Sequence, residues 1–400
     1  MTPKRAYLDY NASAPLRPSA LASMQSALSC TGNASSVHGE GRDLRRMIES
    51  ARRDVAALVG SDSSSVTFTS SATEAAHLAL CPDISCNGST IAASRLYVLE
   101  TEHPCVLAGG RFEPDQIISI PVDGDGVIDH AAFKKLMDDH DGNEGVPFVA
   151  IQLANSETGV IQPVKEIAQA VRFKGGYTLC DAVQAAGRIP ISTADLGVDF
   201  LILSAHKIGG PHGAGALVNA HSILDFPPAI RGGGQEKNRR AGTENVAAIA
   251  GFGAAAKEAL KEVDNYSQLS TLRDSIEVQL LPICAANGLA EQVQIFGGQA
   301  NRLANTLLFG VAGLKAETAL IALDLDGVAV SSGSACSSGK VGASHVLQAM
   351  KVDETLAKGA IRVSLGWNST EDDVNKFIAA FEKIVKRLGE QTETKISGAA

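Results

Sequence analysis

Short apolar runs alternate with longer amphipathic patterns along the first two thirds of the chain. The runs are rich in β-branched residues and lie at 65–69, 147–154, 177–182 and 199–205. Between them lie helical patterns such as "GRDLRRMIESARRDVAALVG" (41–60), which closes on a glycine. Because strands that alternate with helices pair in parallel and are covered on both faces, we expect an α/β unit with a mostly parallel sheet.

The last third of the chain predicts a second, smaller unit. An alanine-rich helix over 243–266 leads away from the first unit, and strands follow at 305–312 and 360–366. A helix over 370–389 carries one apolar stripe, made of Val374, Phe377, Ile378, Phe381, Ile384, Val385 and Leu388. We therefore expect a large domain over 15–257, a small α+β domain formed by 1–14 and 258–390, and a frayed tail over 391–400.

Composition and charge narrow the class of partner. The 400 residues are 45% hydrophobic and 20% charged, with a net charge of −9 and no long Lys/Arg run, so a nucleic-acid partner is not expected. The N-terminus lacks the apolar core of a signal peptide, and no run of about 18 apolar residues occurs. We expect a cytoplasmic protein that does not enter a membrane and acts on small molecules or proteins.

The seven cysteines are scattered and odd in number, so a disulfide framework is not expected. Cys81, Cys86 and Cys105 accompany His103 in sequence but lack paired CxxC spacing, so no resident metal site is expected. By default each cysteine is a small buried hydrophobic residue. The same default holds for Cys336, unless its position in the Ser/Gly-rich stretch "SSGSACSSGK" (331–340) gives it another role.

Two stretches place reactive side chains at the ends of predicted strands. "DFLILSAHKIGGPHGAGAL" (199–217) runs from an apolar strand into Lys207 and then into glycines, and "GGYTLCDAVQAAG" (175–187) ends its strand with Asp181. Ligands of α/β sheets bind at the carboxyl ends of strands. There a desolvated lysine can form a Schiff base, and a buried aspartate can pair with a protonated pyridine nitrogen. Taken singly, Lys207 would be a solvated loop residue, and the alternative for Asp181 is an exposed strand-end residue that caps a helix.

A third stretch, "VTFTSSATEAAHLAL" (66–80), turns from a strand into a helix that starts near Ala72 and Thr73. Free backbone N–H groups and the helix dipole make such a turn suitable for a phosphate. Alone this signal is weak, because Ser/Thr caps open most helices. The three stretches together supply an amine, an acid and a phosphate site.

These stretches occur with five further motifs: "YLDYNASAP" (7–15), "TEHPCVL" (101–107), "NSETGVIQPV" (155–164), "RRAGTENV" (239–246) and "SSGSACSSGKVGASHVL" (331–347). Over about residues 7–388 the chain resembles the pyridoxal 5'-phosphate (PLP)-dependent cysteine desulfurases of the NifS/IscS type, in the class V aminotransferase family. The resemblance implies fold type I of PLP-dependent transferases. It also implies a seven-stranded-type sheet in the large domain.

Carried over residue by residue, the resemblance implies catalytic roles for Lys207, Cys336 and His103. Lys207 forms the Schiff base with PLP and moves the Cα proton of the substrate, and His103 stacks on the cofactor ring. Asp181 pairs with the ring nitrogen, and Arg362 holds the substrate carboxylate, which suits a planar guanidinium. The other implied cofactor-binding residues are Ala72, Thr73, Asn155, Ser156, Gln184, Ser204, Ala205, His206 and Thr243.

Two of these contacts carry further implications. Gln184 bonds the phenolic oxygen of the cofactor, and Thr243 reaches the phosphate bound by a neighbouring subunit. The resemblance therefore implies a homodimer.

The chain departs from the family pattern at three places. Ser71 stands where a glycine is typical of the phosphate turn. The family's Asn-Asn-Glu is Asn155-Ser156-Glu157 here, which leaves open whether Ser156 or Asn155 contacts the cofactor. The start "Ala-Thr-Thr-Pro" of the family reads "ASAP" at 12–15, with fewer hydroxyls near the substrate. None of these changes removes a catalytic group.

The implied activity converts L-cysteine to L-alanine and transfers sulfane sulfur to Cys336 as a persulfide. The sulfur then passes to an acceptor such as an iron–sulfur scaffold protein, and Cys336 could ligate an iron–sulfur cluster during this transfer. The small residues around Cys336 predict a segment without fixed packing. Three alternatives remain on the same fold: a selenocysteine lyase, another class V aminotransferase, and an assembly partner that has lost catalysis.

Overall fold

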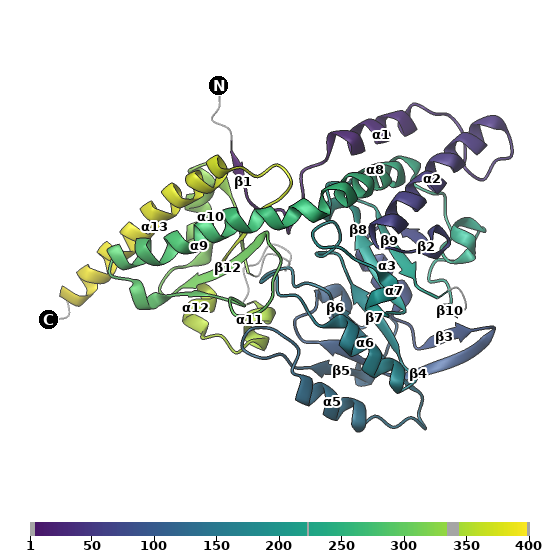
Figure 1. Ribbon diagram of the computed structural model, residues 1–400, viewed down its shortest axis with the longest axis horizontal. Helices are drawn as coiled ribbons and strands as arrows, with labels where there is room; N and C mark the ends of the chain where they lie inside the picture. Colours follow the sequence, from purple (N-terminus) through teal and green to yellow (C-terminus); the bar gives the residue numbers. More distant parts are fainter. Residues whose placement is uncertain (1–4, 222–223, 334–343, 398–400) are drawn as a thin grey trace.

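The computed structural model describes residues 5–221, 224–333 and 344–397, and their side chains as far as 390. A large sheet with its helices forms one side of the molecule, and a smaller sheet with its helices forms the other (Figure 1). A long helical passage joins them: α8 (Val246–Glu262), the 3-10 segment η5 (Val263–Gln268) and α9 (Leu269–Ala286). The predicted boundary at 257/258 falls inside α8, and the predicted domain limits stay a prediction.

Within the described residues the large sheet has nine strands, in the order β10-β3-β4-β6-β7-β8-β9-β2, with β5 also pairing with β4. The central pairs β4–β6, β6–β7 and β7–β8 are parallel, as the alternating pattern predicts, whereas β3, β9, β2 and β10 pair in antiparallel fashion. The strands are β2 (Val66–Thr69), β3 (Asp83–Cys86), β4 (Ser89–Leu99), β5 (Ile117–Ile120), β6 (Val146–Gln152), β7 (Tyr177–Asp181), β8 (Phe200–Ser204), β9 (Gly215–Asn219) and β10 (Leu224–Asp225).

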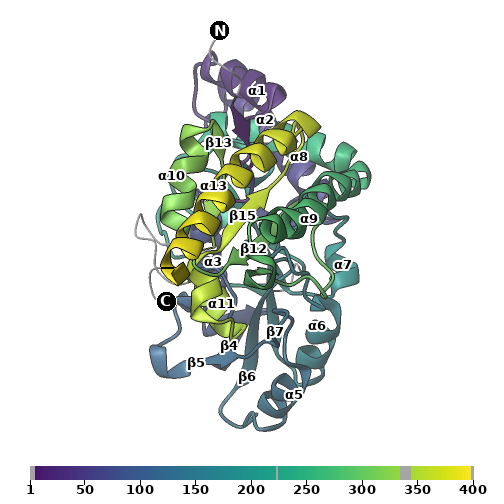
Figure 2. The same ribbon diagram turned by 90° about the vertical axis from the view of Figure 1, so that its left-hand side faces the viewer.

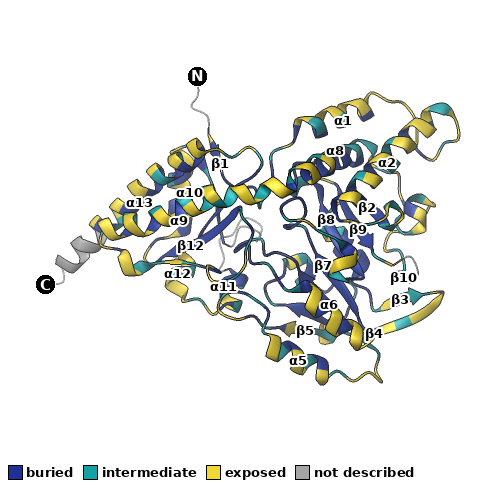
Figure 3. Ribbon diagram, in the orientation of Figure 1, coloured by how far each residue is buried: buried dark blue, intermediate teal, exposed yellow. Residues whose placement is uncertain are grey.

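Helices cover both faces of this sheet. Neighbouring residues of β6 alternate between two cores, with Val149 and Ile151 in one and Phe148 and Ala150 in the other. The first core contains residues of α1 (Pro18–Leu28), α2 (Gly39–Leu58), α5 (His130–Asp138), α6 (Val164–Phe173) and α8, with α7 (Thr193–Leu196) against it, and the second contains residues of α3 (Ala72–Ala79) and α4 (Pro104–Leu107). The central strands β6, β7, β8 and β9 are accordingly almost completely buried (Figure 3).

The smaller sheet is antiparallel, in the order β11-β12-β15-β14. In Figure 2, α13 (Glu371–Ser397) lies in front of this sheet, with α10 (Ala316–Leu325) and α9 on its two sides. Leu307 and Phe309 of β12 pack in the core beneath these helices, but Leu308 belongs to a core of the large sheet, so the two units share buried contacts. The strands are β11 (Val293–Ile295), β12 (Thr306–Val311), β14 (Ser331–Ser332) and β15 (Ile361–Ser364).

The N-terminal strand joins the small unit. β1 (Ala6–Tyr7) pairs in parallel with β13 (Val328–Ala329). The remaining short elements are α11 (His345–Ala349), α12 (Glu354–Lys358) and the 3-10 segments η1 (Ser63–Ser65), η2 (Pro114–Gln116), η3 (Ala205–Lys207), η4 (Gln235–Asn238) and η6 (Ala290–Gln292). Among the described residues, no helix combines the length and the apolar character needed to cross a membrane.

Helix α13 is longer than the sequence pattern predicts. Val374, Phe377, Phe381 and Val385 of the expected stripe are buried, but the helix continues to Ser397, through most of the segment expected to be a frayed tail. No proline ends it there. Gly389 lets the helix pass close to α9, because a Cβ at this position would lie 2.6 Å from the carbonyl oxygen of Asn287.

Candidate active site

The carboxyl ends of three parallel strands meet at one edge of the large sheet. In the register of the sheet Gln152, the last residue of β6, pairs with Asp181, the last residue of β7, and Asp181 in turn pairs with Ile202 of β8. Strand β8 ends at Ser204, and the 3-10 segment η3 then presents Lys207. The predicted lysine and aspartate therefore lie side by side where α/β sheets bind ligands.

A cavity of about 220 Å³ opens at this edge. Nine predicted site residues line it: Ala72, Thr73, His103, Ser156, Asp181, Gln184, Ser204, His206 and Lys207. The lining also includes residues for which no role was predicted, among them Gln152 and Cys105. Gln152 shared with Asp181 the signal of a strand end, and Cys105 lies in the quoted motif "TEHPCVL".

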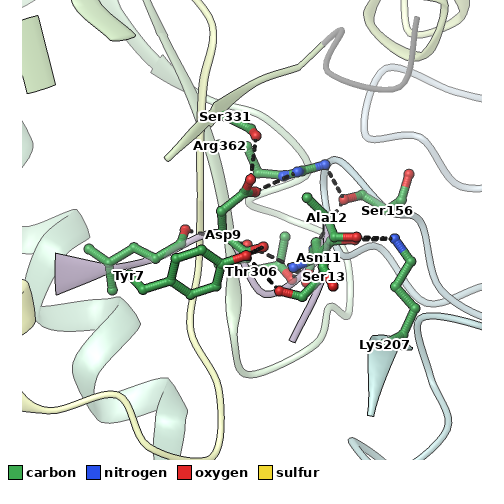
Figure 4. Close-up of polar contacts among 12 residues, drawn as sticks. Tyr7, Asp9, Asn11, Ala12, Ser13, Ser156, Lys207, Thr306, Ser331 and Arg362 are labelled. Carbon is green, nitrogen blue, oxygen red and sulfur yellow. Dashed lines mark hydrogen bonds and ion pairs between the residues drawn. The ribbon is translucent and has the colours of Figure 1, made fainter. Parts of the chain in front are cut away.

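Lys207 is held by the N-terminal segment of the chain. Its Nζ donates hydrogen bonds to the carbonyl oxygens of Asn11, at 2.6 Å, and Ala12, at 2.8 Å (Figure 4). Gln184 Nε2 donates to the same Asn11 carbonyl oxygen at 3.0 Å. The segment after β1 thus fixes the direction in which the lysine amine points.

The carboxyl group of Asp181 is buried. Burial raises the pKa of Asp181 to about 6, although a hydrogen bond from the Val183 N–H and the charge of Lys207 favour its ionised form. Glu102, which is fully buried, lies near enough to interact with Asp181, and burial followed by this like charge raises the pKa of Glu102 well above its usual range. A cation bound beside Asp181 would relieve this cost.

Another part of the cavity wall is the turn from β2 into α3. Ser71 caps the helix, because its Oγ accepts a hydrogen bond from the Glu74 N–H at 3.2 Å. Its φ of −170° is extended backbone that any residue adopts, so the serine in place of the typical glycine causes no strain here. The N–H groups at the start of α3 can receive an anion, with Ser204 and His206 nearby on the cavity wall.

Two histidines of the cavity are neutral at physiological pH. Burial, and then the charge of Lys207, lowers the pKa of His103 to about 4 and that of His206 to about 3. His103 caps α4, and its Nδ1 lies 3.0 Å from Cys105 Sγ. Burial raises the pKa of the Cys105 thiol to about 12, so this thiol stays protonated.

The structure separates Ser156 from Asn155. Ser156 lines the cavity, whereas the Asn155 side chain is buried in its own turn. Asn155 Nδ2 donates to the Thr101 carbonyl oxygen at 3.0 Å, and Asn155 Oδ1 accepts hydrogen bonds from the N–H groups of Glu157 and Thr158. These bonds occupy the amide of Asn155, so Ser156 is the member of the pair that faces the cavity.

Three other predicted residues do not line the cavity of this chain. Ala205 is fully buried in the core, and Thr243 is exposed just before α8. Arg362, on β15, is 1% exposed and makes an ion pair with Asp9, with 2.9 Å between Nη2 and Oδ1. Its Nη1 donates to the Ser156 carbonyl oxygen at 3.1 Å, which places the guanidinium behind a residue of the cavity wall (Figure 4).

Cys336 lies outside the described residues, and the prediction about the packing of its segment concerns residues outside them too. The chain on both sides of 334–343 is attached close to the cavity. Before it, Ser331 Oγ donates to Asp9 Oδ2 at 2.8 Å. After it, Ser344 Oγ donates to Glu157 Oε2 at 2.6 Å, and His345 Nε2 lies 2.8 Å from the Glu102 carbonyl oxygen. Glu157 and Glu102 are sequence neighbours of the wall residues Ser156 and His103.

The chemistry of this cavity fits PLP. Asp181 could pair with the ring nitrogen, the start of α3 could hold the phosphate, and Lys207 could reach the aldehyde carbon. In addition, Gln184 Oε1 is buried without a hydrogen-bond partner among the described residues, and a polar ligand atom could satisfy it. Fold and cavity together define an enzyme of the PLP-dependent transferase class.

Comparison with known proteins identifies the family. Residues 6–377 match the family model described as aminotransferase class-V, so the chain belongs to the class-V aminotransferase family, whose members use PLP. It is 38% identical over 393 residues to a cysteine desulfurase IscS of Dictyoglomus turgidum, with 96% of this chain and 95% of the relative covered. A cysteine desulfurase of Cereibacter sphaeroides is 37% identical over 391 residues, with 96% and 97% covered.

Solved structures agree with this assignment. A NifS-like protein from Rickettsia africae superposes with a TM-score of 0.83 at 34% identity, over 95% of this chain and 99% of that protein. A second NifS-like protein superposes with a TM-score of 0.82 at 30% identity, again over 95% and 99%. The predicted fold class, PLP-dependent transferase of fold type I, is confirmed.

Proposed function

We propose that this chain is a cysteine desulfurase, which converts L-cysteine to L-alanine and holds the released sulfur on Cys336 as a persulfide. The observation that carries the proposal is the attachment of both chain ends around 334–343 to residues next to the cavity of Lys207 and Asp181. The stretch of sequence between these two attachments contains Cys336. The names of the relatives support the same activity.

Lys207 and Asp181 serve the proton-transfer steps of this reaction. PLP, when bound, withdraws electrons from the substrate Cα and so makes its proton removable. The amine of Lys207 takes that proton and returns one to the substrate, from a position fixed by the carbonyl groups of Asn11 and Ala12. Asp181 supplies a buried negative charge, which keeps the ring nitrogen of the cofactor protonated.

Arg362 and Cys336 serve the substrate itself. We assign the cysteine carboxylate to Arg362, whose guanidinium is held by Asp9 and by the Ser156 carbonyl oxygen. The Cys336 thiolate attacks the substrate sulfur, so an S–S bond forms while the C–S bond breaks and its electron pair goes to carbon. Protonation of that carbon gives alanine. The enzyme thiol and cysteine are thereby converted to an enzyme persulfide and alanine, with no other oxidant or reductant.

Two parts of the proposal concern partners. The persulfide passes its sulfur to an acceptor, for which an iron–sulfur scaffold protein is the first candidate. The active form is a homodimer, in which Thr243 of one subunit approaches the phosphate in the other. The exposure of Thr243 before α8 is consistent with such a contact.

The decisive experiment compares Cys336→Ser with Cys30→Ser. Cys30 is an exposed free cysteine and serves as the matched control. We expect Cys336→Ser to bind PLP normally but to lose alanine formation from L-cysteine by at least about a hundredfold, because the nucleophile that accepts sulfur is gone. Cys30→Ser should keep wild-type activity. Alanine and sulfide released in the presence of a reductant are the quantities to measure.

The opposite outcome would redirect the proposal. Cys105 is a poor substitute for Cys336 as acceptor, because burial raises the pKa of its thiol to about 12 and so disfavours the thiolate. Full alanine formation by Cys336→Ser would show that Cys336 is not the sulfur acceptor and would favour a selenocysteine lyase. A wild-type protein that binds PLP but forms no alanine from L-cysteine would favour another class V aminotransferase. Absence of PLP binding by the wild-type protein would favour the non-catalytic partner.

A further inference from the structure

The loop 234–242 has a backbone conformation that other contacts must maintain. Three consecutive non-glycine residues in it have positive φ: Glu236 at 46°, Lys237 at 58° and Asn238 at 65°. Each such residue costs conformational energy, so a run of three persists only where the surroundings fix it. The sequence motif "RRAGTENV" begins inside this loop, and the catalytic steps above use none of its residues before Thr243.

One end of the loop is fixed on α2 and β2 by a buried ion pair. Glu236 Oε2 and Oε1 accept hydrogen bonds from Arg52 Nη1 and Nη2 at 2.7 and 2.9 Å. The Phe68 N–H donates to Glu236 Oε2 at 2.8 Å, and the Arg52 guanidinium lies 4.8 Å above the Phe68 ring. The side chains of Arg52 and Glu236 are at most 5% exposed. A bidentate pair with these additional contacts holds the loop rigidly.

The other end of the loop reaches the phosphate turn. Arg240 Nε donates to Glu74 Oε1 at 2.8 Å, and its Nη2 lies 3.4 Å from Glu74 Oε2. Glu74 is in the first turn of α3, and its Oε2 also accepts a hydrogen bond from the Ser70 N–H at 2.7 Å. Arg240 thus fixes Glu74, and Glu74 fixes the backbone of the turn that leads into Ala72 and Thr73 on the cavity wall.

Glu74 is ionised next to the place assigned to a phosphate. Burial alone would raise the pKa of Glu74, but the hydrogen bonds from Arg240 and Ser70 hold it below its usual value. A negative side chain in this position repels an anion on simple Coulomb grounds. A role for Glu74 in holding the shape of the turn explains why a negative side chain lies there. The binding energy gained from a correctly shaped turn must then exceed the energy lost to repulsion.

We propose that Glu74 and Arg240 are positioning residues for the cofactor phosphate, which connect the phosphate turn to the rigid loop 234–242. The inference rests on the proposed assignment of the turn 70–73 to the phosphate. Neither residue touches the cofactor; both act by keeping the N–H groups at the start of α3 directed at the cavity.

The direction in which Glu74→Gln changes the affinity for PLP distinguishes a positioning role of Glu74 from a purely electrostatic one. If Glu74 acted only as a charge, Glu74→Gln would bind PLP more tightly, because a repulsive group is removed. If Glu74 positions the turn, Glu74→Gln weakens PLP binding by about tenfold, since the turn loses its tie to Arg240. Pyridoxal has the same ring and aldehyde but no phosphate, so its affinity should change less than about twofold.

The experiment titrates the apoproteins with PLP and with pyridoxal and measures both dissociation constants. We expect Arg240→Gln to behave like Glu74→Gln, and Arg240→Lys to recover part of the PLP affinity. Lys134→Gln, which breaks the exposed Lys134–Asp138 pair on α5, is the control and should leave both constants unchanged. The thermal midpoint of each apoprotein reports whether a variant has lost its fold rather than the geometry of one turn.

The failures are separable. Wild-type protein that binds PLP no better than pyridoxal would overturn the assignment of the turn, and the inference with it. A wild-type preference for PLP that Glu74→Gln retains or increases would overturn the inference alone. Equal weakening of PLP and pyridoxal by Glu74→Gln would likewise contradict a phosphate-specific role.

Discussion

Three carboxyl groups around the cavity have raised pKa values. Asp181, Glu102 and Glu157 are all buried, and burial is the main cause that raises each pKa. Asp181 was predictable from its place at a strand end, because that place has a general chemical meaning. Glu102 and Glu157 were not, since nothing in a sequence marks an acid as buried before the fold is known.

Glu157 should make the stability of the wild-type protein depend on pH in a way that Glu157→Gln does not. Burial raises its pKa to about 7, with a hydrogen bond from Ser344 and the charge of Arg362 acting in the opposite sense. Between pH 4.5, the pKa of Glu157 in the unfolded chain, and about pH 7, the native protein holds a proton on Glu157 that the unfolded chain releases. The stability that this proton contributes is lost as pH rises through that window. Relative to Glu157→Gln, the wild-type protein should lose about 2 to 3 kcal/mol of unfolding free energy between pH 5 and pH 8.

Urea denaturation of the two apoproteins across this pH range provides the measurement. Other titrating groups are common to both proteins, so their contributions cancel in the difference. Parallel curves of unfolding free energy against pH would show that Glu157 ionises normally in the folded state.

Among the elements, β2, α3 and β9 meet at a closely packed junction beside the cavity. Gly215 begins β9 and pairs with Thr69 of β2 and Ser204 of β8. A Cβ at this position would lie 2.7 Å from the Ala72 N atom and would also collide with the backbone of Ser71. The glycine therefore allows the phosphate turn to lie directly against the sheet.

Gly215→Ala should displace the start of α3, because the atoms in the way belong to backbone and cannot rotate aside. We expect a loss of about 1–3 kcal/mol in stability, typical of overpacking, together with weaker PLP binding. Gly39→Ala is the control, since Gly39 also lies at the start of a helix but a Cβ there meets nothing within 4 Å. Thermal midpoints and PLP titrations of both variants test this, and identical behaviour of the two would refute the steric argument.

Elements with a clear period were predictable from sequence, and elements defined by their partners were not. The predicted strands at 65–69, 147–154, 177–182 and 199–205 correspond to β2, β6, β7 and β8, which are buried on both faces. Strand β4 was missed because its first four residues, 89–92, are mostly exposed and pair with the short strand β3. Helix α9 was missed as well; it contains Pro282, which normally argues against a helix interior.

At the scale of the whole molecule, the candidate site is assembled from segments that are far apart in the chain. Asp9 and Arg362, 353 positions apart, form one ion pair, and the segment between Asp9 and Ala12 links it to Lys207. This link begins just after β1 in the small unit and ends at the edge of the large sheet, where Ala12 meets Lys207 (Figure 4). Family motifs indicated Arg362, but its pairing with Asp9 depends on the packing of the N-terminal segment beside β15, which has no signature in sequence.

The proposed homodimer makes a prediction that only a shared site can satisfy. Lys207→Ala removes the catalytic amine of its own subunit, and Thr243→Ala removes the phosphate contact that its subunit offers to the neighbour. In a hybrid of the two, one site has both defects and the other has none. Random reassociation of equal amounts gives half hybrids, so the mixture should reach about a quarter of wild-type activity at limiting PLP. Activity equal to the average of the two separate variants would contradict a site completed by the partner subunit.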